Sequence, residues 1–161
     1  MCLNLLLKYQ IQPVYLNDVP IKSVNERKHL GIYVLAGKEF STSVKKPLTS
    51  FLCSANTILN VVRKPSEQVL MQLLYTNCVP LLTYGCEIRK HTGREMIKFE
   101  VALNDCIRKI FTFQRWESTR MLRTSFGYQS VTEIFAIRKQ TFERNLQRTG
   151  NQVLVTLFSI L

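Results

Sequence analysis

The stretch from Thr92 to Ile110 reads TGREMIKFEVALNDCIRKI and carries two signals of a helix. Thr92 and Glu95 have the spacing of a capping box, in which each side chain accepts a hydrogen bond from the other residue's backbone N–H. Apolar residues then recur at alternating steps of three and four: Met96, Phe99, Leu103, Cys106 and Ile110. This spacing places them on one face and predicts a seam against another helix.

Comparable patterns lie on both sides of this stretch. From Ser43 onward, apolar residues recur at helical steps over about five turns: Val44, Leu48, Phe51, Leu52, Ala55, Ile58, Leu59 and Val62. A second helix is predicted over Val69, Leu70, Leu73 and Leu74, and Val79-Pro80 is expected to end it. Residues 81–87 then form an apolar connector.

The C-terminal third of the chain predicts two more helices. A short helix is expected from Ser118 to Thr124, ended by Phe126-Gly127. Ser130 and Glu133 have the spacing of a second capping box, which opens the last helix. Its predicted core face consists of Val131, Ile134, Phe135, Phe142 and Leu146. Arg138, Lys139, Arg144 and Arg148 are expected on its remaining, exposed surface.

The N-terminal residues favour strands. Asn17-Asp18 lies between β-forming residues and suits a tight hairpin turn, because both residues tolerate positive φ. Pro20 cannot donate to a strand ladder, so we expect it at an edge or a ladder-free position. After a charged break, Leu30 to Val34 reads as another strand, in which Gly31 predicts a bulge or a close backbone approach.

The predicted fold class is therefore α+β, mainly α. An N-terminal β-hairpin over residues 1–40 precedes a bundle of four to five helices over residues 41–148. An apolar, uncharged tail follows over residues 149–161. This tail could be a buried helix end, an exposed aggregation-prone strand, or out-of-place sequence at a truncated frame.

Charge gives the first indication of function. The 161 residues contain 22 Lys and Arg against 11 Asp and Glu, a formal net charge of +11. A surface of one sign concentrates polyanions, so nucleic acid is the favoured partner. An anionic membrane surface or a generic basic protein would also fit. No apolar run approaches the roughly 20 residues that span a bilayer, so no integral membrane protein is expected.

Residues for catalysis or metal binding are sparse. The two aspartates, Asp18 and Asp105, neighbour no other carboxylate, whereas two-metal phosphoryl transfer needs converging acidic groups. His29 and His91 stand far apart, and the five cysteines include no C-x-x-C. We therefore expect no catalytic centre, metal or cofactor. The odd, well-separated cysteines favour reduced and mostly buried thiols in an intracellular protein, nuclear or cytoplasmic.

Several segments, in order, resemble one protein family. VYLNDVPI (residues 14–21), Val24 and KHLGI (28–32) resemble the strand, turn and K-Y-L-G segment that follows the palm in reverse transcriptases of non-LTR (LINE-type) retrotransposons. VPLLTYGCE (79–87) is similar to the family's V-x-P-x-L-x-Y-G-x-E-x-W, with Arg89 where Trp is usual. LNDCIRKI (103–110) is similar to Q-N-x-x-L-R-x-I, and SVTEI (130–134) with Arg138 to the closing S-I-x-x-I…R.

The resemblance covers about residues 15 to 148 and implies a thumb with its helical connector, without the palm that carries the catalytic aspartates. It implies a non-enzymatic fragment that binds template–primer, an RNA–DNA or DNA duplex, weakly and in a salt-dependent way. The implied candidates near the primer are Lys28, His29, Leu30 and Gly31. The basic pairs that bracket the first helix are further candidates for phosphate contacts: Lys45, Lys46, Arg63 and Lys64.

Two alternatives remain open at this point. The seam from Met96 to Ile110, or the apolar tail, could drive self-association or protein–protein binding. The chain could also be a degenerate open reading frame without selected activity.

Two aromatic residues have structural interpretations. Trp116, which follows Arg115, is expected to be a core anchor rather than a stacking platform. Tyr84-Gly85 is expected to be a packed turn rather than a nucleotide contact.

Overall fold

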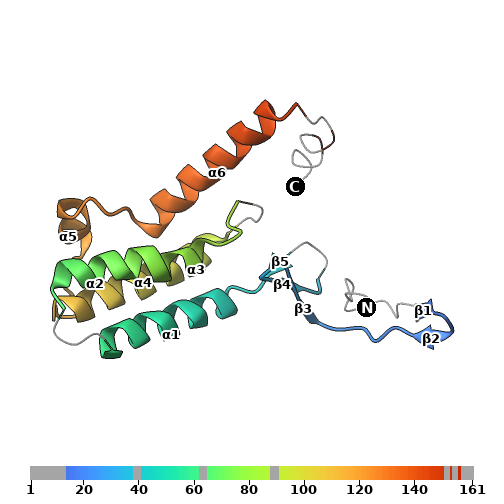
Figure 1. Ribbon diagram of the computed structural model, residues 1–161, viewed down its shortest axis with the longest axis horizontal. Coiled ribbons are helices and arrows are strands. Elements are labelled where there is room, and N and C mark those ends of the chain that lie inside the picture. Colours follow the sequence, from blue (N-terminus) through green and yellow to red (C-terminus); the bar gives the residue numbers. More distant parts are fainter. Residues whose placement is uncertain are drawn as a thin grey trace. The chain divides into compact units, whose positions relative to one another are not determined.

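The computed structural model describes residues 14–37, 41–61, 65–87, 91–150, 153 and 156 (Figure 1). Strands come first and helices follow, which confirms the α+β, mainly α fold class with an N-terminal β-hairpin. The chain divides into two compact units, Met1–Pro47 and Leu48–Leu161.

The described part of the first unit begins with the predicted hairpin. Strands β1 (Tyr15–Leu16) and β2 (Val19–Pro20) pair antiparallel around Asn17 and Asp18, whose φ angles are 48° and 63°. Ile21 N–H donates to the Val14 carbonyl at 2.7 Å. Because hydrogen-bonded and non-hydrogen-bonded pairs alternate, Pro20 occupies a position where its nitrogen faces away from β1. Its predicted ladder-free position is thereby confirmed.

A three-stranded antiparallel sheet follows in the same unit. Its order is β3 (Glu26–His29), β4 (Ile32–Leu35) and β5 (Ser41–Thr42). Strand β3 lies in the stretch that was expected to be a charged break, so that prediction is wrong. All four side chains of β3 are exposed, and the sequence therefore shows no alternation of apolar residues to indicate a strand. Gly31 lies in the turn before β4, so the expected bulge within a strand is wrong.

Helix α1 (Lys45–Val61) forms where the apolar spacing predicts it. Pro47 is its third residue, a position at which the missing N–H has no partner to lose. Phe51 and Ala55 are buried, but Leu52 is exposed. The buried stripe is therefore narrower than the predicted face.

The second predicted helix does not end at Val79-Pro80. Helix α2 (Glu67–Leu73) continues as the π-helical turn η1 (Leu74–Cys78) and then as α3 (Val79–Thr83). Val79 N–H donates to the Leu74 carbonyl, five residues back. This widened turn lets Pro80 stand at the start of α3, where a missing N–H is tolerated. Residues 81–83, expected in a connector, are helical.

Both predicted capping boxes are confirmed. At the start of α4 (Gly93–Ile110), Thr92 N–H donates to Glu95 Oε2 at 2.9 Å, and Glu95 N–H donates to Thr92 Oγ1 at 3.3 Å. Ser130 and Glu133 exchange equivalent bonds at the start of α6 (Val131–Arg148). The short helix α5 (Arg120–Ser125) ends before Gly127, whose φ is 70°.

The core of the second unit lies along α4. Its buried residues are Phe99, Ala102, Leu103, Cys106, Ile107 and Ile110. Helices α2 and α6 pack against α4, and α3 packs against α6. The aromatic rings of Phe99 and Phe135 meet edge to face with centroids 5.9 Å apart. The predicted seam is thus a helix-packing face.

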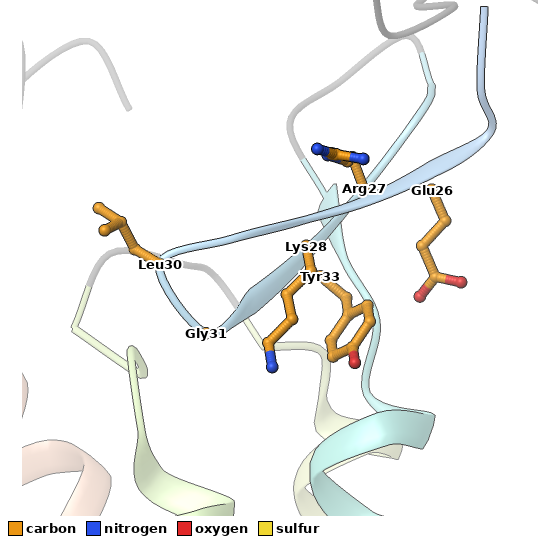
Figure 2. Close-up of a pocket in the computed structure, with 6 residues that line it drawn as sticks. All are labelled: Glu26, Arg27, Lys28, Leu30, Gly31 and Tyr33. Carbon is orange, nitrogen blue, oxygen red and sulfur yellow. The ribbon is translucent and has the colours of Figure 1, made fainter. Parts of the chain in front are cut away.

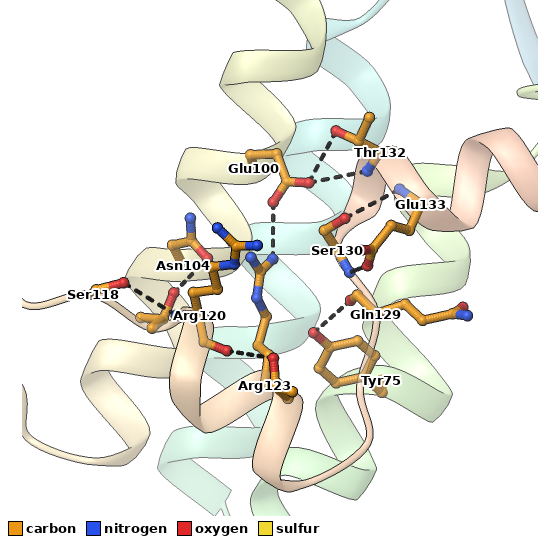
Figure 3. Close-up of polar contacts among 12 residues, drawn as sticks. Tyr75, Glu100, Asn104, Ser118, Arg120, Arg123, Gln129, Ser130, Thr132 and Glu133 are labelled. Carbon is orange, nitrogen blue, oxygen red and sulfur yellow. Dashed lines mark hydrogen bonds and ion pairs between the residues drawn. The ribbon is translucent and has the colours of Figure 1, made fainter.

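A carboxylate joins three helices beside this core (Figure 3). Glu100 of α4 accepts from Arg123 Nη1 of α5 at 3.0 Å. It also accepts from Thr132 N–H and Oγ1, at the start of α6, at 3.0 and 3.1 Å.

Tyr75 of η1 contacts the loop between α5 and α6. Its Oη donates to the Gln129 carbonyl at 3.0 Å, and its ring stacks on Tyr128 with centroids 4.1 Å apart.

Some side chains lie outside the places expected for them. Trp116 is 82% exposed, so the core-anchor prediction is wrong. Gly85 has φ 69°, as a turn requires, but the Tyr84 ring is exposed rather than packed. Arg138 donates to the Thr83 carbonyl at 3.4 Å and pairs with Glu87 at 3.7 Å, so it is less exposed than expected.

Of the apolar tail, the structure describes Val153 and Thr156 alone, and the other residues of the tail lie outside it. Among the described helices, none combines the length and apolar character needed to cross a membrane.

Phe99 and Ile97 offer a matched pair for testing the core. Phe99→Ala removes a fully buried ring that also contacts Phe135, and we expect the free energy of unfolding to fall by about 3–5 kcal/mol. Ile97→Ala, on the same helix at a 63% exposed position, should change it by less than about 0.5 kcal/mol. Urea unfolding followed by circular dichroism measures both. Equal losses would contradict this core.

Candidate nucleic-acid interface

A tight turn joins β3 to β4. Leu30 and Gly31 are its two central residues, with φ angles of 46° and 82°, and His29 pairs with Ile32 at its base. Two positive φ values are characteristic of the type I′ turn that fits the twist of a hairpin. Glycine adopts this conformation freely, but leucine pays roughly 1–2 kcal/mol for it. The Leu30 side chain is nevertheless 77% exposed at the hairpin tip.

The register of this hairpin decides which side chains share a face. Lys28 stands opposite Tyr33, so both side chains project from the same face. Arg27, opposite Val34, projects from the other face, as Figure 2 shows. Glu26 lies two residues before Lys28 and shares its face.

Helix α1 adds a second lysine to the first of these faces. Lys46 Nζ lies 5.3 Å from the centre of the Tyr33 ring, and Lys28 Nζ lies 5.8 Å from it. Both distances are within the range of cation–π attraction. Lys28, Tyr33 and Lys46 are hereafter called the hairpin cluster. All three belong to the first unit.

The hairpin cluster is electropositive. Within the described part of the chain, neither Lys28 nor Lys46 forms an ion pair with a carboxylate. Helix α1 has no acidic residue in its first turn, where the helix dipole already favours anions. Glu26 is the acid on the same face. The balance of charge around the Tyr33 ring favours a bound anion.

An open hollow of about 510 Å³ lies along the hairpin (Figure 2). It is lined by Glu26, Arg27, Lys28, Leu30, Gly31 and Tyr33. Its lining combines three charged side chains with an aromatic ring and an apolar tip. The hollow can therefore offer both charge and apolar contact to one ligand.

The structure brings together part of the predicted site. Lys28, Leu30 and Gly31 line one hollow, and Lys46 joins Lys28 at the Tyr33 ring. His29 belongs to the opposite face of the hairpin by register. Lys45 is exposed at the first residue of α1. Arg63 and Lys64 lie outside the described residues.

Sequence reasoning missed Tyr33 and Arg27. The signal for Tyr33 was available, since a two-residue turn at Leu30-Gly31 places residues 28 and 33 opposite each other. Reading Glu26–His29 as a break removed the partner strand from the prediction. Arg27 was missed for the same reason.

Of the four cysteines in the described part of the chain, three are buried. These are Cys78, Cys86 and Cys106, whereas Cys53 is exposed. Burial raises the pKa of the Cys106 thiol to about 11, and it also raises the pKa of Cys78, whose Sγ lies 3.3 Å from Ser54 Oγ. Among the described residues, no group of three or more His, Cys, Asp or Glu could hold a metal ion.

Comparison with known proteins adds no name to this site. No family model matches the chain, and no curated protein or solved structure is significantly similar to it. The geometry and the charge of the hairpin cluster are therefore the structural basis for assigning a binding function.

The turn at Leu30-Gly31 can be tested with two substitutions that should change the stability of the hairpin in opposite directions. Leu30→Asn places a residue that tolerates positive φ in the turn and should stabilise the hairpin by roughly 0.5–1 kcal/mol. Gly31→Ala should destabilise it, because its φ of 82° disfavours a Cβ. Amide hydrogen exchange of Lys28 and Tyr33 reports the opening of the hairpin. Faster exchange in Leu30→Asn would contradict the assigned turn.

Thiol labelling tests the burial of the cysteines. In a Cys2→Ser background at neutral pH, we expect one fast-reacting thiol, Cys53, because it is exposed. Cys106 should react after unfolding, since its buried thiol is almost fully protonated at neutral pH. Mass spectrometry of digested, labelled protein identifies each site. Native Cys106 labelled as fast as Cys53 would overturn this packing.

Proposed function

We propose that this chain is the thumb and connector region of a non-LTR retrotransposon reverse transcriptase and that it binds a template–primer duplex. The family part of this proposal comes from the resemblance across residues 15 to 148. The binding part is carried by one observation, the two lysines held over the Tyr33 ring in the hairpin cluster.

The hairpin cluster supplies the chemistry of a phosphate contact. Two ammonium groups at one ring give a local positive charge that a phosphate neutralises, and such contacts position a duplex without reading its sequence. The Tyr33 ring orients both lysine side chains through cation–π attraction. Leu30 adds an exposed apolar tip, which can lie against sugars in the groove beside the contacted phosphates.

On this proposal the region holds the duplex and leaves catalysis to a palm. Neither of the two aspartates neighbours another carboxylate in the sequence. Asp18 belongs to the β1–β2 turn of the first unit, whereas Asp105 belongs to α4 of the second unit and pairs with Arg108 at 2.9 Å. Two-metal catalysis needs carboxylates that converge on ions about 4 Å apart.

Self-association is the weaker alternative. It depended on an uncovered seam along α4 or on the apolar tail. Phe99, Leu103 and Cys106 of that seam are fully buried within the second unit, so this surface is already occupied. Most of the tail lies outside the described residues, and no observation there favours a partner.

Salt dependence tests the role of the hairpin cluster. Each phosphate contact contributes about −0.9 to the slope of log Kobs against log salt concentration for B-form DNA. For an RNA–DNA hybrid duplex, we expect a steep negative slope for the unmodified chain. Lys28→Gln with Lys46→Gln should make this slope shallower by about 2 and weaken binding at low salt. Fluorescence anisotropy of a labelled duplex measures both quantities.

A matched control removes the same charge elsewhere. Lys139→Gln with Arg144→Gln changes two exposed positions on α6 and lowers the net charge equally. Its slope should stay close to that of the unmodified chain. The proposal fails if the two double variants lose slope equally, or if the unmodified chain does not bind the hybrid at low ionic strength.

A further inference from the structure

Trp116 is held at the surface between α4 and α5. It is the single tryptophan of the sequence, and its side chain is 82% exposed. Tryptophan has the largest apolar surface of the amino acids and is highly buried on average. Because tryptophan is enriched at interfaces, an indole left this open is a candidate contact for a ligand.

The segment that follows Trp116 is tied to α4 by two hydrogen bonds. Arg108 Nε donates to the Glu117 carbonyl at 3.1 Å, and Thr119 Oγ1 donates to Asn104 Oδ1 at 2.7 Å. Thr119 itself is buried. These bonds hold the residues that follow Trp116, so its exposure belongs to an ordered segment.

Residues 114–117, which include Trp116, form a turn that is also closed by hydrogen bonds. Glu117 N–H donates to the Gln114 carbonyl at 3.1 Å, and Gln114 N–H donates to Glu117 Oε2 at 3.1 Å. Phe113 N–H donates to the Arg108 carbonyl at 2.9 Å. The turn therefore presents the indole from a defined backbone.

Charge around this turn is positive. The three acids between residues 100 and 123 already have partners within the chain. Glu100 accepts from Arg123 and Thr132. Asp105 accepts from Arg108, and Glu117 accepts from the Gln114 N–H. Arg115 and Arg120 are exposed, and in the described part of the chain neither forms an ion pair with a carboxylate. An open indole is thus accompanied by two exposed guanidinium groups, of which that of Arg120 also lies within electrostatic reach of Glu133.

We propose that Trp116 is a stacking platform for a base of single-stranded nucleic acid, with Arg115 and Arg120 attracting its phosphates. A single strand offers its base faces, whereas the bases of a duplex are already stacked on one another. Base stacking on an aromatic ring tolerates any sequence, which suits a site with no hydrogen-bonding pocket. The site lies in the second unit and holds whether or not the hairpin cluster binds a duplex.

The single tryptophan makes this site directly observable in the full chain. A short single-stranded oligodeoxythymidylate, titrated at low salt, should quench the intrinsic tryptophan fluorescence saturably, and a duplex of equal length should quench it much less. Trp116→Ala should weaken binding of the labelled strand by about tenfold, whereas Trp116→Phe should retain part of the affinity. Fluorescence anisotropy measures binding in both variants.

Three controls separate the outcomes. Met121→Ala changes another side chain of high exposure, 76%, and should leave the affinity unchanged. Arg115→Gln with Arg120→Gln should reduce affinity and salt dependence while the fold persists by circular dichroism. Lys28→Gln with Lys46→Gln should leave the quenching intact.

Three results would overturn the assignment. In the first, the strand binds without quenching the tryptophan. In the second, Trp116→Ala binds as tightly as the unmodified chain. In the third, tryptophan emission changes with protein concentration in the absence of any oligonucleotide. That result would mean that a second copy of the chain covers the indole.

Discussion

The turn at Leu30 and Gly31 sets the geometry on which the hairpin cluster depends. Both residues have positive φ, and this conformation fixes which residues of β3 and β4 stand opposite each other. A shift of one residue would move Lys28 to the face that carries Arg27 and would separate it from Tyr33. The strained conformation of Leu30 is thus part of the arrangement that gathers two lysines at one ring.

The second unit depends on a different interaction, the carboxylate of Glu100. It accepts hydrogen bonds from α5 and from the first turn of α6 while its own helix supplies the core face. The capping box of Ser130 and Glu133 begins α6 beside Thr132, so the helix start and the tie to α4 stabilise the same turn. The segment between α4 and α5, from which Trp116 projects, is tied to α4 by the bonds of Arg108 to the Glu117 carbonyl and of Thr119 to Asn104.

Local signals predicted well where a few adjacent residues decide the structure. Thr92 with Glu95, Ser130 with Glu133, and Asn17-Asp18 each formed the cap or turn that their sequence indicates, because the partners lie within four residues. Prediction failed where a structural feature depends on residues far away in the sequence, or where the sequence shows no periodic apolar pattern. Pro80 is accommodated by a π-helical turn five residues long, β3 has four exposed side chains without alternation, and the exposure of Trp116 follows from hydrogen bonds to α4. Of the candidate site, the lysines were visible as charges, but the ring that joins them required the strand register.

A nuclear magnetic resonance titration of the full chain with an RNA–DNA hybrid duplex tests the central claim most directly, because it locates binding residue by residue. The account predicts that backbone amide shifts concentrate at Lys28 to Tyr33 and at Lys46, and that they disappear as salt is raised. Binding that leaves these amides unchanged and shifts the exposed face of α6 around Lys139 and Arg144 would contradict it.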